Sequence, residues 1–397
     1  GGSWSANIEL NVLDVAGVSV AFGSQRVIDD VSFRIAPAEI VGIAGESGSG
    51  KSTICRAAMG LLPSTAEVTG DIRLGERPLL GLDAGEWAKL RGRDISMIFQ
   101  NPSSHLDPLQ AVGRQIARPM MRHLGLSGGE ARKRAVGLLE DVGIREPAMR
   151  ARSYPHELSG GMKQRVMIAA AISCSPGLLI ADEPTTALDV TVQAKVLELL
   201  QALNRQRGLA IALISHDLGV LAHICSRIIV MRRGRIVEQG TARQIVADPQ
   251  HPYTQLLVGS QPGRKRLRSG WSETGASRPL LEVKGLSVLF PVKRGILDML
   301  ANRRPAPFAA LDGVDIAVES GETVGIVGES GSGKSTLARA VIGQNTPAAG
   351  TISLDGQRVA ALKGPARAQF SRRVQMVFQN PYDSLNPRMS ALEAIAE

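Results

Sequence analysis

One stretch of this sequence occurs twice. Residues 40–53 read IVGIAGESGSGKST, and residues 323–336 read TVGIVGESGSGKST. Two shorter segments also recur, since residues 13–22 resemble residues 281–290 and residues 97–102 resemble residues 376–381. Self-similarity of this kind indicates two copies of one folding unit. We therefore predict a complete first domain over residues 8–258, a linker over residues 259–279, and the N-terminal part of a second domain over residues 280–397.

The composition is that of a globular protein. Hydrophobic residues make up 44% and charged residues 21% of the chain, which are ordinary values. The longest apolar run, residues 166–181, is interrupted by polar residues and by proline, so it does not predict a membrane span of about 20 residues. The net charge of +9 favours an anionic partner without choosing among nucleotide, nucleic acid and lipid. The three cysteines lack CxxC spacing, and we expect them in the core rather than on a metal.

Hydrophobic periodicity predicts antiparallel strands followed by a parallel α/β core. Alternating apolar residues over 11–35 indicate the antiparallel strands. Buried strands are expected at residues 40–44, 177–181 and 209–214, helices at 51–62, 161–173 and 191–207, mostly helical structure over 104–153, and a hairpin over 228–240. The buried face of the 191–207 helix is predicted to hold Val192, Val196, Leu199, Leu200 and Leu203.

A glycine-rich loop in each copy predicts phosphate binding. Residues 45–52 satisfy the pattern GxxxxGK[ST] between a strand and a helix. Glycines let backbone N–H groups face phosphates, and the positive end of the following helix adds to the attraction. We expect Lys51 to contact the β- and γ-phosphates and the Ser52 hydroxyl to bind Mg²⁺. The predicted nucleotide-binding residues are Gly45, Ser47, Gly48, Gly50, Lys51, Ser52 and Thr53, and in the second copy Gly328, Ser330, Gly331, Gly333, Lys334, Ser335 and Thr336.

Two carboxylates end the apolar strand LLIADE at residues 178–183. Asp182 is placed to hold the Mg²⁺ shell, and Glu183 is placed to polarise an attacking water molecule. The alternative, an acidic strand end that meets solvent, is disfavoured because PTTALD follows directly at residues 184–189.

Upstream of these carboxylates, residues 154–165 read YPHELSGGMKQR. This segment resembles the signature motif of the ATP-binding-cassette (ABC) ATPases. In that family the signature faces the ATP held by an opposing cassette, which implies this role for Ser159, Gly160 and Gly161. The family's fold is a P-loop NTPase cassette with a parallel core sheet, an N-terminal antiparallel β-subdomain and a helical signature subdomain.

The resemblance implies roles for residues outside these motifs. Gln100 and Gln379 resemble the Q-loop glutamine, Asp189 the D-loop aspartate, and His216 the switch histidine. Phe22 and Phe290 resemble the aromatic residue that stacks on adenine, although each could instead be a core strand residue. The implied catalytic residues are Glu183, His216 and Gln100, and the implied Mg²⁺ ligands are Ser52, Gln100, Asp182, Ser335 and Gln379.

The segment HPYTQLL at residues 251–257 is similar to the oligopeptide, dipeptide and nickel importer ATPases, some of which fuse two cassettes. This similarity implies a subunit that binds and hydrolyses ATP to drive uptake of di- or oligopeptides or a related small solute. The implied partners are two separate transmembrane permease subunits and, indirectly, an extracytoplasmic solute-binding protein, with no nucleic acid. The implied location is peripheral, on the cytoplasmic face of the plasma (inner) membrane.

The second copy carries Lys334, Ser335 and Gln379 but no signature, acidic strand end or switch histidine within residues 280–397. We therefore expect no complete ATPase site within one chain of these residues, and expect pairing with a second cassette in cis or in trans. Two alternatives stay open. One is a soluble ABC ATPase that acts on nucleic acid, suggested by the basic run at residues 264–268. The other is a truncated fragment that binds ATP without turnover.

Overall fold

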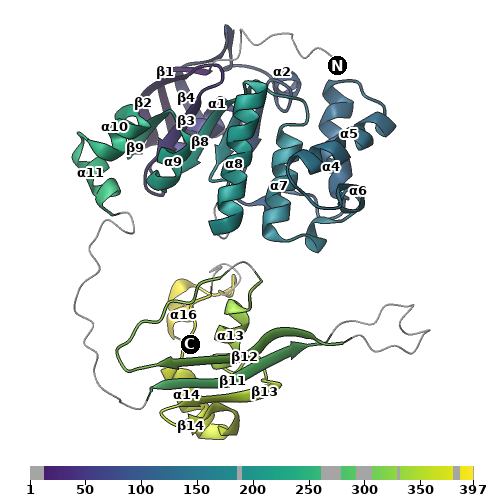
Figure 1. Ribbon diagram of the computed structural model, residues 1–397. Coiled ribbons are helices and arrows are strands. Elements are labelled where there is room, and N and C mark those ends of the chain that lie inside the picture. The colour runs from purple at the N-terminus through teal and green to yellow at the C-terminus, as the bar shows by residue number, and fades with distance from the viewer. Residues whose placement is uncertain are drawn as a thin grey trace. The chain divides into compact units, whose positions relative to one another are not determined.

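The computed structural model describes residues 13–185, 190–260, 279–291, 306–328, 331–378 and 385–396. The chain divides into two compact units, Gly1–Ser269 and Gly270–Glu397, whose elements are labelled in Figure 1. Over the described ranges, every helix is too short or too polar to cross a bilayer.

The first unit begins with an antiparallel sheet whose strand order is β2-β1-β4-β5. The central strand β1 places Val15 opposite Phe33 of β2 and opposite Ile72 of β4. All three side chains are buried, as expected where alternate residues of a strand face the core. The predicted antiparallel pairing over residues 11–35 is confirmed, but β4 and β5 were not predicted. The strands are β1 (Leu13–Phe22), β2 (Gln25–Ile35), β4 (Ala66–Leu74) and β5 (Arg77–Pro78).

The core of the first unit is a six-stranded sheet of order β10-β9-β3-β8-β7-β6. Pairing is parallel from β9 across to β6, and only β10 runs antiparallel to its neighbour. This confirms the predicted parallel α/β core, although strand β6 was not foreseen. The strands are β3 (Ile40–Ala44), β6 (Ile95–Ile98), β7 (Leu178–Asp182), β8 (Ala210–Ser215), β9 (Arg227–Arg232) and β10 (Arg235–Thr241).

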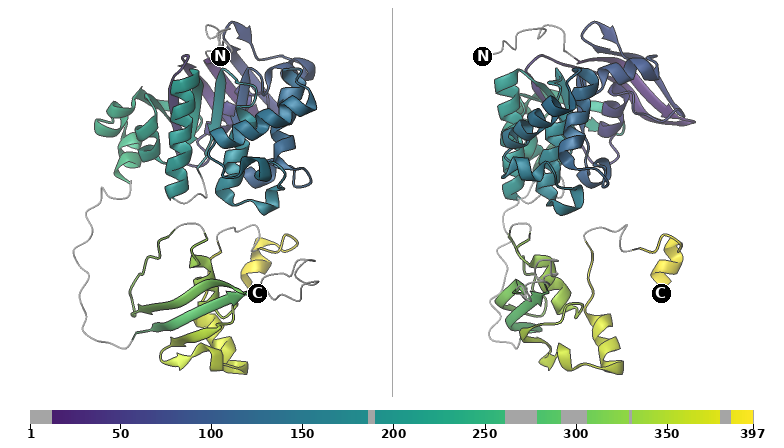
Figure 2. Two further views of the ribbon diagram at one scale, coloured as in Figure 1. Left: turned by 45° about the vertical axis from the view of Figure 1, so that its right-hand side comes forward. Right: turned by 90° about the vertical axis from the view of Figure 1, so that its right-hand side faces the viewer.

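Both faces of this sheet are covered, which explains why β3, β7 and β8 are buried at every position. Alternate residues of β7 contribute to two different cores: Leu179 packs with the helices, whereas Leu178 and Ile180 pack with the antiparallel sheet. In Figure 2 the purple antiparallel strands lie to one side of the blue and teal helices. A strand that is covered on both faces has a continuous run of apolar residues in its sequence, and β3, β7 and β8 each show such a run.

The helices of the first unit follow the predicted pattern with one correction. The helix expected over residues 51–62 ends at Ala58. Gly60 adopts a left-handed φ of 59° and packs so closely on Trp87 that a Cβ would lie 2.2 Å from the indole, so the chain turns there. In the helix over residues 190–207, the predicted Val196, Leu200 and Leu203 are buried, and Leu197 is buried as well. The predicted Val192 and Leu199 are only partly buried. The helices are α1 (Lys51–Ala58), α2 (Ala84–Leu90), α3 (Pro102–His105), α4 (Val112–His123), α5 (Gly128–Asp141), α6 (Pro147–Arg150), the 3-10 turn η1 (Pro155–Glu157), α7 (Gly160–Ala171), α8 (Val190–Arg207), α9 (Leu218–Ile224), α10 (Ala242–Ala247) and α11 (Pro252–Gly259).

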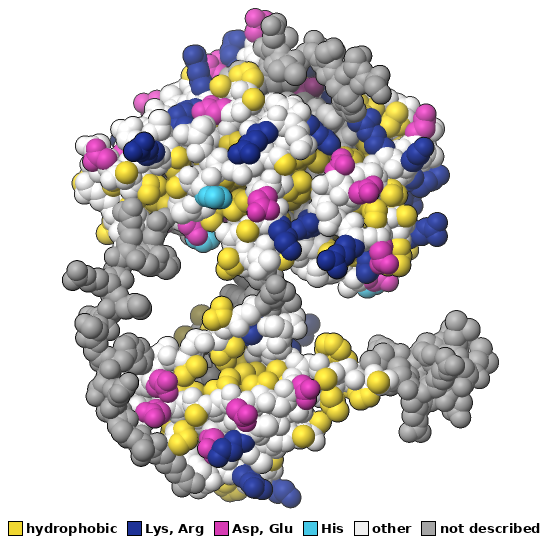
Figure 3. All heavy atoms as spheres, in the orientation of Figure 1, with side chains coloured by type: hydrophobic (Ala, Val, Ile, Leu, Met, Phe, Trp, Pro, Cys, Tyr) yellow, Lys and Arg dark blue, Asp and Glu magenta, His cyan; other side chains and the backbone are white. Residues whose placement is uncertain are grey.

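The second unit repeats the antiparallel sheet, with strand order β12-β11-β13-β14. Val283 of β11 lies opposite Ile316 and Ile352, in the same arrangement as Val15 in the first unit. Apolar side chains gather over the β11–β12 region in Figure 3. Phe290 of β11 pairs with Phe308 of β12, and the two are 40% and 59% exposed. The elements are β11 (Leu281–Phe290), β12 (Phe308–Val318), α13 (Lys334–Val341), β13 (Ala349–Leu354), β14 (Gln357–Arg358), the 3-10 turn η2 (Val359–Ala361), α14 (Gly364–Arg373) and α16 (Ala391–Ala396).

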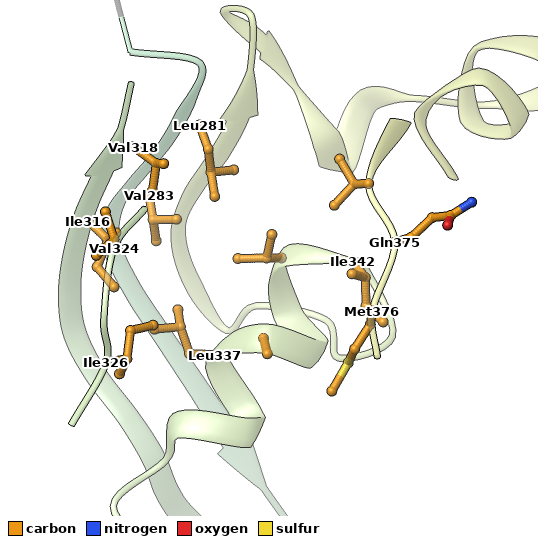
Figure 4. Close-up of a pocket in the computed structure, with 13 residues that line it drawn as sticks. Leu281, Val283, Ile316, Val318, Val324, Ile326, Leu337, Ile342, Gln375 and Met376 are labelled. Carbon is orange, nitrogen blue, oxygen red and sulfur yellow. The ribbon is translucent and has the colours of Figure 1, made fainter. Parts of the chain in front are cut away.

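The parallel sheet is not repeated among the described residues of the second unit. Residues 322–328, which correspond in sequence to β3, lie outside any strand, and Val327 is 95% exposed. In the first unit β3 pairs with β8 and β9, and β6 pairs with β7, all of which come later in the chain. A cavity of about 270 Å³ opens beneath the unpaired segment (Figure 4), lined by Leu281, Val283, Ile316, Val318, Val324, Ile326 and seven neighbours.

Candidate active site

The predicted site residues of the first unit converge because four neighbouring strands end at one edge of the sheet. Strands β3, β8, β7 and β6 are adjacent and parallel. The glycine-rich loop follows β3, His216 follows β8, Asp182 and Glu183 lie at the end of β7, and Gln100 follows β6. Ligands of open α/β sheets bind at this carboxyl edge. The parallel order of strands, rather than proximity in sequence, therefore brings these groups together.

At two positions the loop between β3 and α1 has no room for a side chain, so these positions require glycine. A Cβ on Gly45, whose φ is 148°, would lie 2.3 Å from the carbonyl oxygen of Met231. A Cβ on Gly50, which precedes α1 with a φ of 101°, would lie 2.5 Å from Ile28. The turn between β9 and β10 also supports the loop, since the Gly234 N–H donates to the Ser49 carbonyl oxygen at 3.0 Å.

Lys51 is 5% exposed and folds back over the loop. Its Nζ donates to the carbonyl oxygens of Gly45 at 2.7 Å and Glu46 at 2.8 Å, and to Ser49 Oγ at 3.3 Å. Burial lowers the pKa of Lys51, and nearby carboxylates oppose part of that effect. The ammonium group is thus held at the loop where the motif predicts phosphate contact.

Ser52 and Asp182 meet although 130 residues separate them, since the Ser52 hydroxyl donates to Asp182 Oδ1 at 2.9 Å. Asp182 is 3% exposed. Burial raises the pKa of Asp182, and the hydrogen bond from Ser52 offsets part of that rise. Over the described part of the chain, His, Cys, Asp and Glu side chains form no group of three that could hold a metal ion. A cation here would need ligands from the hydroxyl, the carboxylate and a bound phosphate together.

Glu183 lies between Gln100 and His216. Gln100 Nε2 donates to Glu183 Oε2 at 2.8 Å, and His216 Nδ1 lies 3.3 Å from Glu183 Oε1. The backbone of Glu183 has a φ of 47°, and its N–H donates to the Ile214 carbonyl oxygen at 3.1 Å. Gln100 and His216, which the resemblance names as catalytic together with Glu183, are therefore each in direct contact with Glu183.

The signature residues lie elsewhere, at the start of α7. Ser159 precedes the helix, and its Oγ accepts a hydrogen bond from the Met162 N–H at 3.3 Å. A Cβ on Gly161 would lie 2.7 Å from Val192 of α8, so α7 and α8 approach closely there. Phe22 ends β1 and is half-buried against the core that contains Ile54. Asp189 lies outside the described residues.

The second unit forms the same lysine arrangement at its own loop. Lys334 Nζ donates to the Gly328 carbonyl oxygen at 2.7 Å and to Ser332 Oγ at 3.3 Å. Gly333 has a φ of 93°, and a Cβ there would lie 2.6 Å from the Ala310 carbonyl oxygen. Gly331 has a φ of 86°, and Ser335 and Thr336 lie in the first turn of α13. Ser330 and Gln379 lie outside the described residues.

One residue beside the loop was not anticipated. Tyr253 of α11 is 3% exposed, and its hydroxyl accepts a hydrogen bond from the Glu46 N–H at 3.0 Å. The sequence segment HPYT marked this position only as a similarity to importer ATPases. No local pattern connects residues 207 positions apart, so sequence reasoning had no signal for this contact.

Residues 28–186 and 311–396 match the ABC transporter family. The chain belongs to this family. The two matched ranges each include one of the glycine-rich loops, so the family match covers parts of both units. The predicted ABC cassette fold is thereby confirmed, and the chain is an ABC ATPase that binds ATP.

Relatives and solved structures agree with this assignment. The peptidoglycan transport ATP-binding protein YejF of Agrobacterium fabrum is 44% identical over 393 residues, which cover 97% of this chain and 70% of that protein. The glutathione import ATP-binding protein GsiA of Pectobacterium atrosepticum is 39% identical over 422 residues, which cover 98% of this chain and 67% of that protein. A solved structure of the dimeric ABC cassette MJ0796, in a post-hydrolysis state bound to ADP and phosphate, matches this chain with 30% sequence identity and a TM-score of 0.53. The match covers 58% of this chain and 99% of the MJ0796 chain. These comparisons favour the transport interpretation over the nucleic-acid alternative.

Proposed function

We propose that this chain is the ATP-hydrolysing subunit of an importer for small peptides or peptide-containing solutes. The observation that carries this proposal is the meeting of Gln100, Glu183 and His216 beside the Lys51 loop. The solute class is taken from the relatives, one of which is named for peptidoglycan transport and another for glutathione import. Peptidoglycan carries short peptides and glutathione is a tripeptide, so a peptide is their common chemistry.

Hydrolysis in this proposal uses Glu183 as the general base. Water attacks the γ-phosphorus, the bond to the β,γ-bridging oxygen breaks, ADP leaves, and Glu183 accepts the proton of the water. Gln100 and His216 orient the Glu183 carboxylate through the contacts at 2.8 Å and 3.3 Å. Lys51 exchanges its loop carbonyls for the phosphates, since these are stronger acceptors for an ammonium group.

Mg²⁺ fits the pair of Ser52 and Asp182. A hydroxyl and a carboxylate 2.9 Å apart supply the hard oxygen ligands that this ion prefers, with phosphate oxygens and water completing the shell. When bound, the ion neutralises charge that develops on the phosphates. In the same proposal Gln100 supplies a further oxygen, and Ser335 and Gln379 serve the second loop.

Two cassettes are expected to act together, because the signature at Ser159 serves the ATP of an opposing cassette. We propose a fused arrangement in which residues 8–258 form one cassette, 259–279 a linker, and 280–397 the N-terminal part of a second. The partner that completes a site is then a second cassette in cis or in trans. The subunit would act on permease subunits at the cytoplasmic face of the membrane.

The decisive experiment is Glu183→Gln in the full chain. We expect phosphate release to fall at least about 100-fold, because general-base catalysis contributes about 10²- to 10⁴-fold, while ATP binding is retained. Glu198→Gln is the matched control, since Glu198 is an exposed acid on α8, and it should leave the rate unchanged. Uptake of a labelled dipeptide by cells that carry either variant should follow the ATPase rate.

Two outcomes would contradict this proposal. If Glu183→Gln hydrolyses ATP as fast as the wild type, the chain does not use this base. If the ATPase is lost but uptake of peptides and glutathione is unchanged, the subunit energises transport of another class of solute.

A further inference from the structure

The segment that follows the parallel sheet returns to the glycine-rich loop. Residues 250–259 form a turn and helix α11, and Tyr253 is the second residue of that helix. Its hydroxyl oxygen lies 3.0 Å from the backbone nitrogen of Glu46, which donates the hydrogen bond. Glu46 immediately follows Gly45, the first residue of the phosphate-binding motif. The contact therefore acts at the start of the loop, whereas Lys51 and Ser52 lie at its end.

The peptide group between Gly45 and Glu46 is held at both of its ends. Its carbonyl oxygen accepts from Lys51 Nζ at 2.7 Å, and its N–H donates to Tyr253 at 3.0 Å. A peptide group is planar, so fixing both polar atoms fixes the orientation of the whole unit. When Lys51 turns toward a phosphate, the bond to Tyr253 is the contact that still holds this peptide in place.

Tyr253 is itself fixed by neighbours that do not belong to the loop. The Glu238 carboxylate of β10 accepts from the N–H groups of Gln250 at 2.9 Å and His251 at 3.0 Å. His251 Nδ1 accepts from the Tyr253 N–H at 3.1 Å. The Arg232 guanidinium lies 4.6 Å from the centroid of the Tyr253 ring, a distance at which a cation is attracted to an aromatic face.

We infer that Tyr253 is a positioning residue for nucleotide binding, which holds the first peptide of the phosphate loop in its binding orientation. The inference rests on nucleotide binding at this loop and does not depend on which solute is imported. A preorganised loop loses less conformational freedom when the nucleotide binds. Residues 250–259 therefore contribute to nucleotide affinity through the peptide group between Gly45 and Glu46.

The test is Tyr253→Phe, which keeps the ring and removes only the hydroxyl. We expect the dissociation constant for ADP, measured by calorimetry on the full chain, to rise about three- to tenfold, because one hydrogen bond of ordinary strength is lost. The amide of Glu46 should also exchange its hydrogen faster, because it has lost its acceptor. The turnover rate at saturating ATP should change less than the KM, since the groups around Glu183 are untouched.

The matched control is Thr254→Val. Thr254 is fully buried next to Tyr253 in α11, and among the described residues its hydroxyl has no hydrogen-bond partner. This variant removes a buried hydroxyl from the same helix, so it reports any general loosening of α11. It should leave both the ADP affinity and the Glu46 exchange rate at wild-type values.

Three results would overturn the inference. Equal ADP affinity in Tyr253→Phe and the wild type would show that the hydroxyl does not position the loop. Equal losses in Tyr253→Phe and Thr254→Val would show that α11 acts only through stability. A wild-type chain that does not bind ADP would overturn both this inference and the proposed function, whereas the first two results leave the proposed function intact.

Discussion

Asp182 is 3% exposed at the end of β7, and burial raises the pKa of its carboxyl group above the ordinary value. Folding therefore disfavours the ionised form of this residue. For such a group, the stabilising contribution is present at low pH and is lost as pH rises through the pKa of the folded state. Near neutral pH the ionised Asp182 destabilises the nucleotide-free fold, which is the cost of keeping a carboxylate where a magnesium ion would bind.

Asp182→Asn should consequently stabilise the nucleotide-free chain and weaken binding of Mg²⁺-ATP. We expect the melting temperature at pH 7 to rise by about 2 °C, and the difference from wild type to shrink as the pH is lowered toward the raised pKa of Asp182. Asp217→Asn is the control. Asp217 precedes α9 and accepts from the Gly219 and Val220 N–H groups, and asparagine caps a helix equally well. A lower melting temperature for Asp182→Asn would contradict this account of the buried charge.

At the scale of elements, both units have an arginine side chain at the C-terminal end of the helix that follows the phosphate loop, which is α1 in the first unit and α13 in the second. In the first unit the Arg91 guanidinium donates to the carbonyl oxygens of Met59 and Gly60, where α1 ends, and lies 4.8 Å from the Trp87 ring centroid. In the second unit Arg367 donates to Ile342 and Gly343 beyond α13, and lies over Phe370. The last carbonyl groups of a helix have no hydrogen-bond donors within the helix. In both units an arginine from a later segment of the chain donates to carbonyl oxygens at this end.

Arg91→Ala should destabilise the first unit by about 1–3 kcal/mol, because two carbonyl groups lose charge-assisted hydrogen bonds. The measurement is chemical unfolding followed through the chain's tryptophan fluorescence. Arg93→Ala is the matched control, since Arg93 is 59% exposed and its pair with Asp94 is 3.8 Å long. Exposed pairs of this kind contribute little to stability. Equal effects of the two substitutions would show that the helix end does not need Arg91.

At the scale of the whole molecule, the chain contains two phosphate loops, around Lys51 and Lys334, and one signature segment at Ser159 within its 397 residues. The contacts of Glu183 with Gln100 and His216 join the ends of strands β6, β7 and β8 in the first unit. The described part of the second unit repeats the antiparallel sheet and the loop helix without these strands. We propose that a second cassette, in cis or in trans, supplies the signature that faces the phosphate loop of the first unit, and the pairing of two first units is the trans arrangement.

This arrangement predicts how the ATPase rate depends on concentration. If two chains pair through their first units, phosphate release should rise with the square of chain concentration when chains are dilute, and should become linear once pairing is complete. The measurement is the initial rate at saturating ATP over at least a hundredfold range of concentration. A rate that is linear from the lowest concentration would show that a single chain hydrolyses ATP without a partner.

The separate motifs could be found from the sequence because each one is local. A glycine-rich loop binds phosphates through its own backbone, and a strand covered on both faces is recognisable as a short apolar run. Hydrophobic patterning therefore predicted β3, β7 and β8 to within a residue or two, and it predicted the antiparallel start of the first unit. It missed β6 because Ile95–Ile98 is only four residues long, too short to show a period.

Contacts between distant residues were decided by the tertiary structure. Gln100 and Glu183 touch because β6 and β7 are parallel neighbours, and Tyr253 reaches Glu46 across 207 residues. In the second unit, residues 323–328 repeat the β3 pattern but lie outside any strand. The corresponding strand of the first unit, β3, takes its hydrogen bonds from β8 and β9, which are far from it in the sequence. Sequence alone determined which chemical groups the protein carries, whereas strand pairing determined which of them meet.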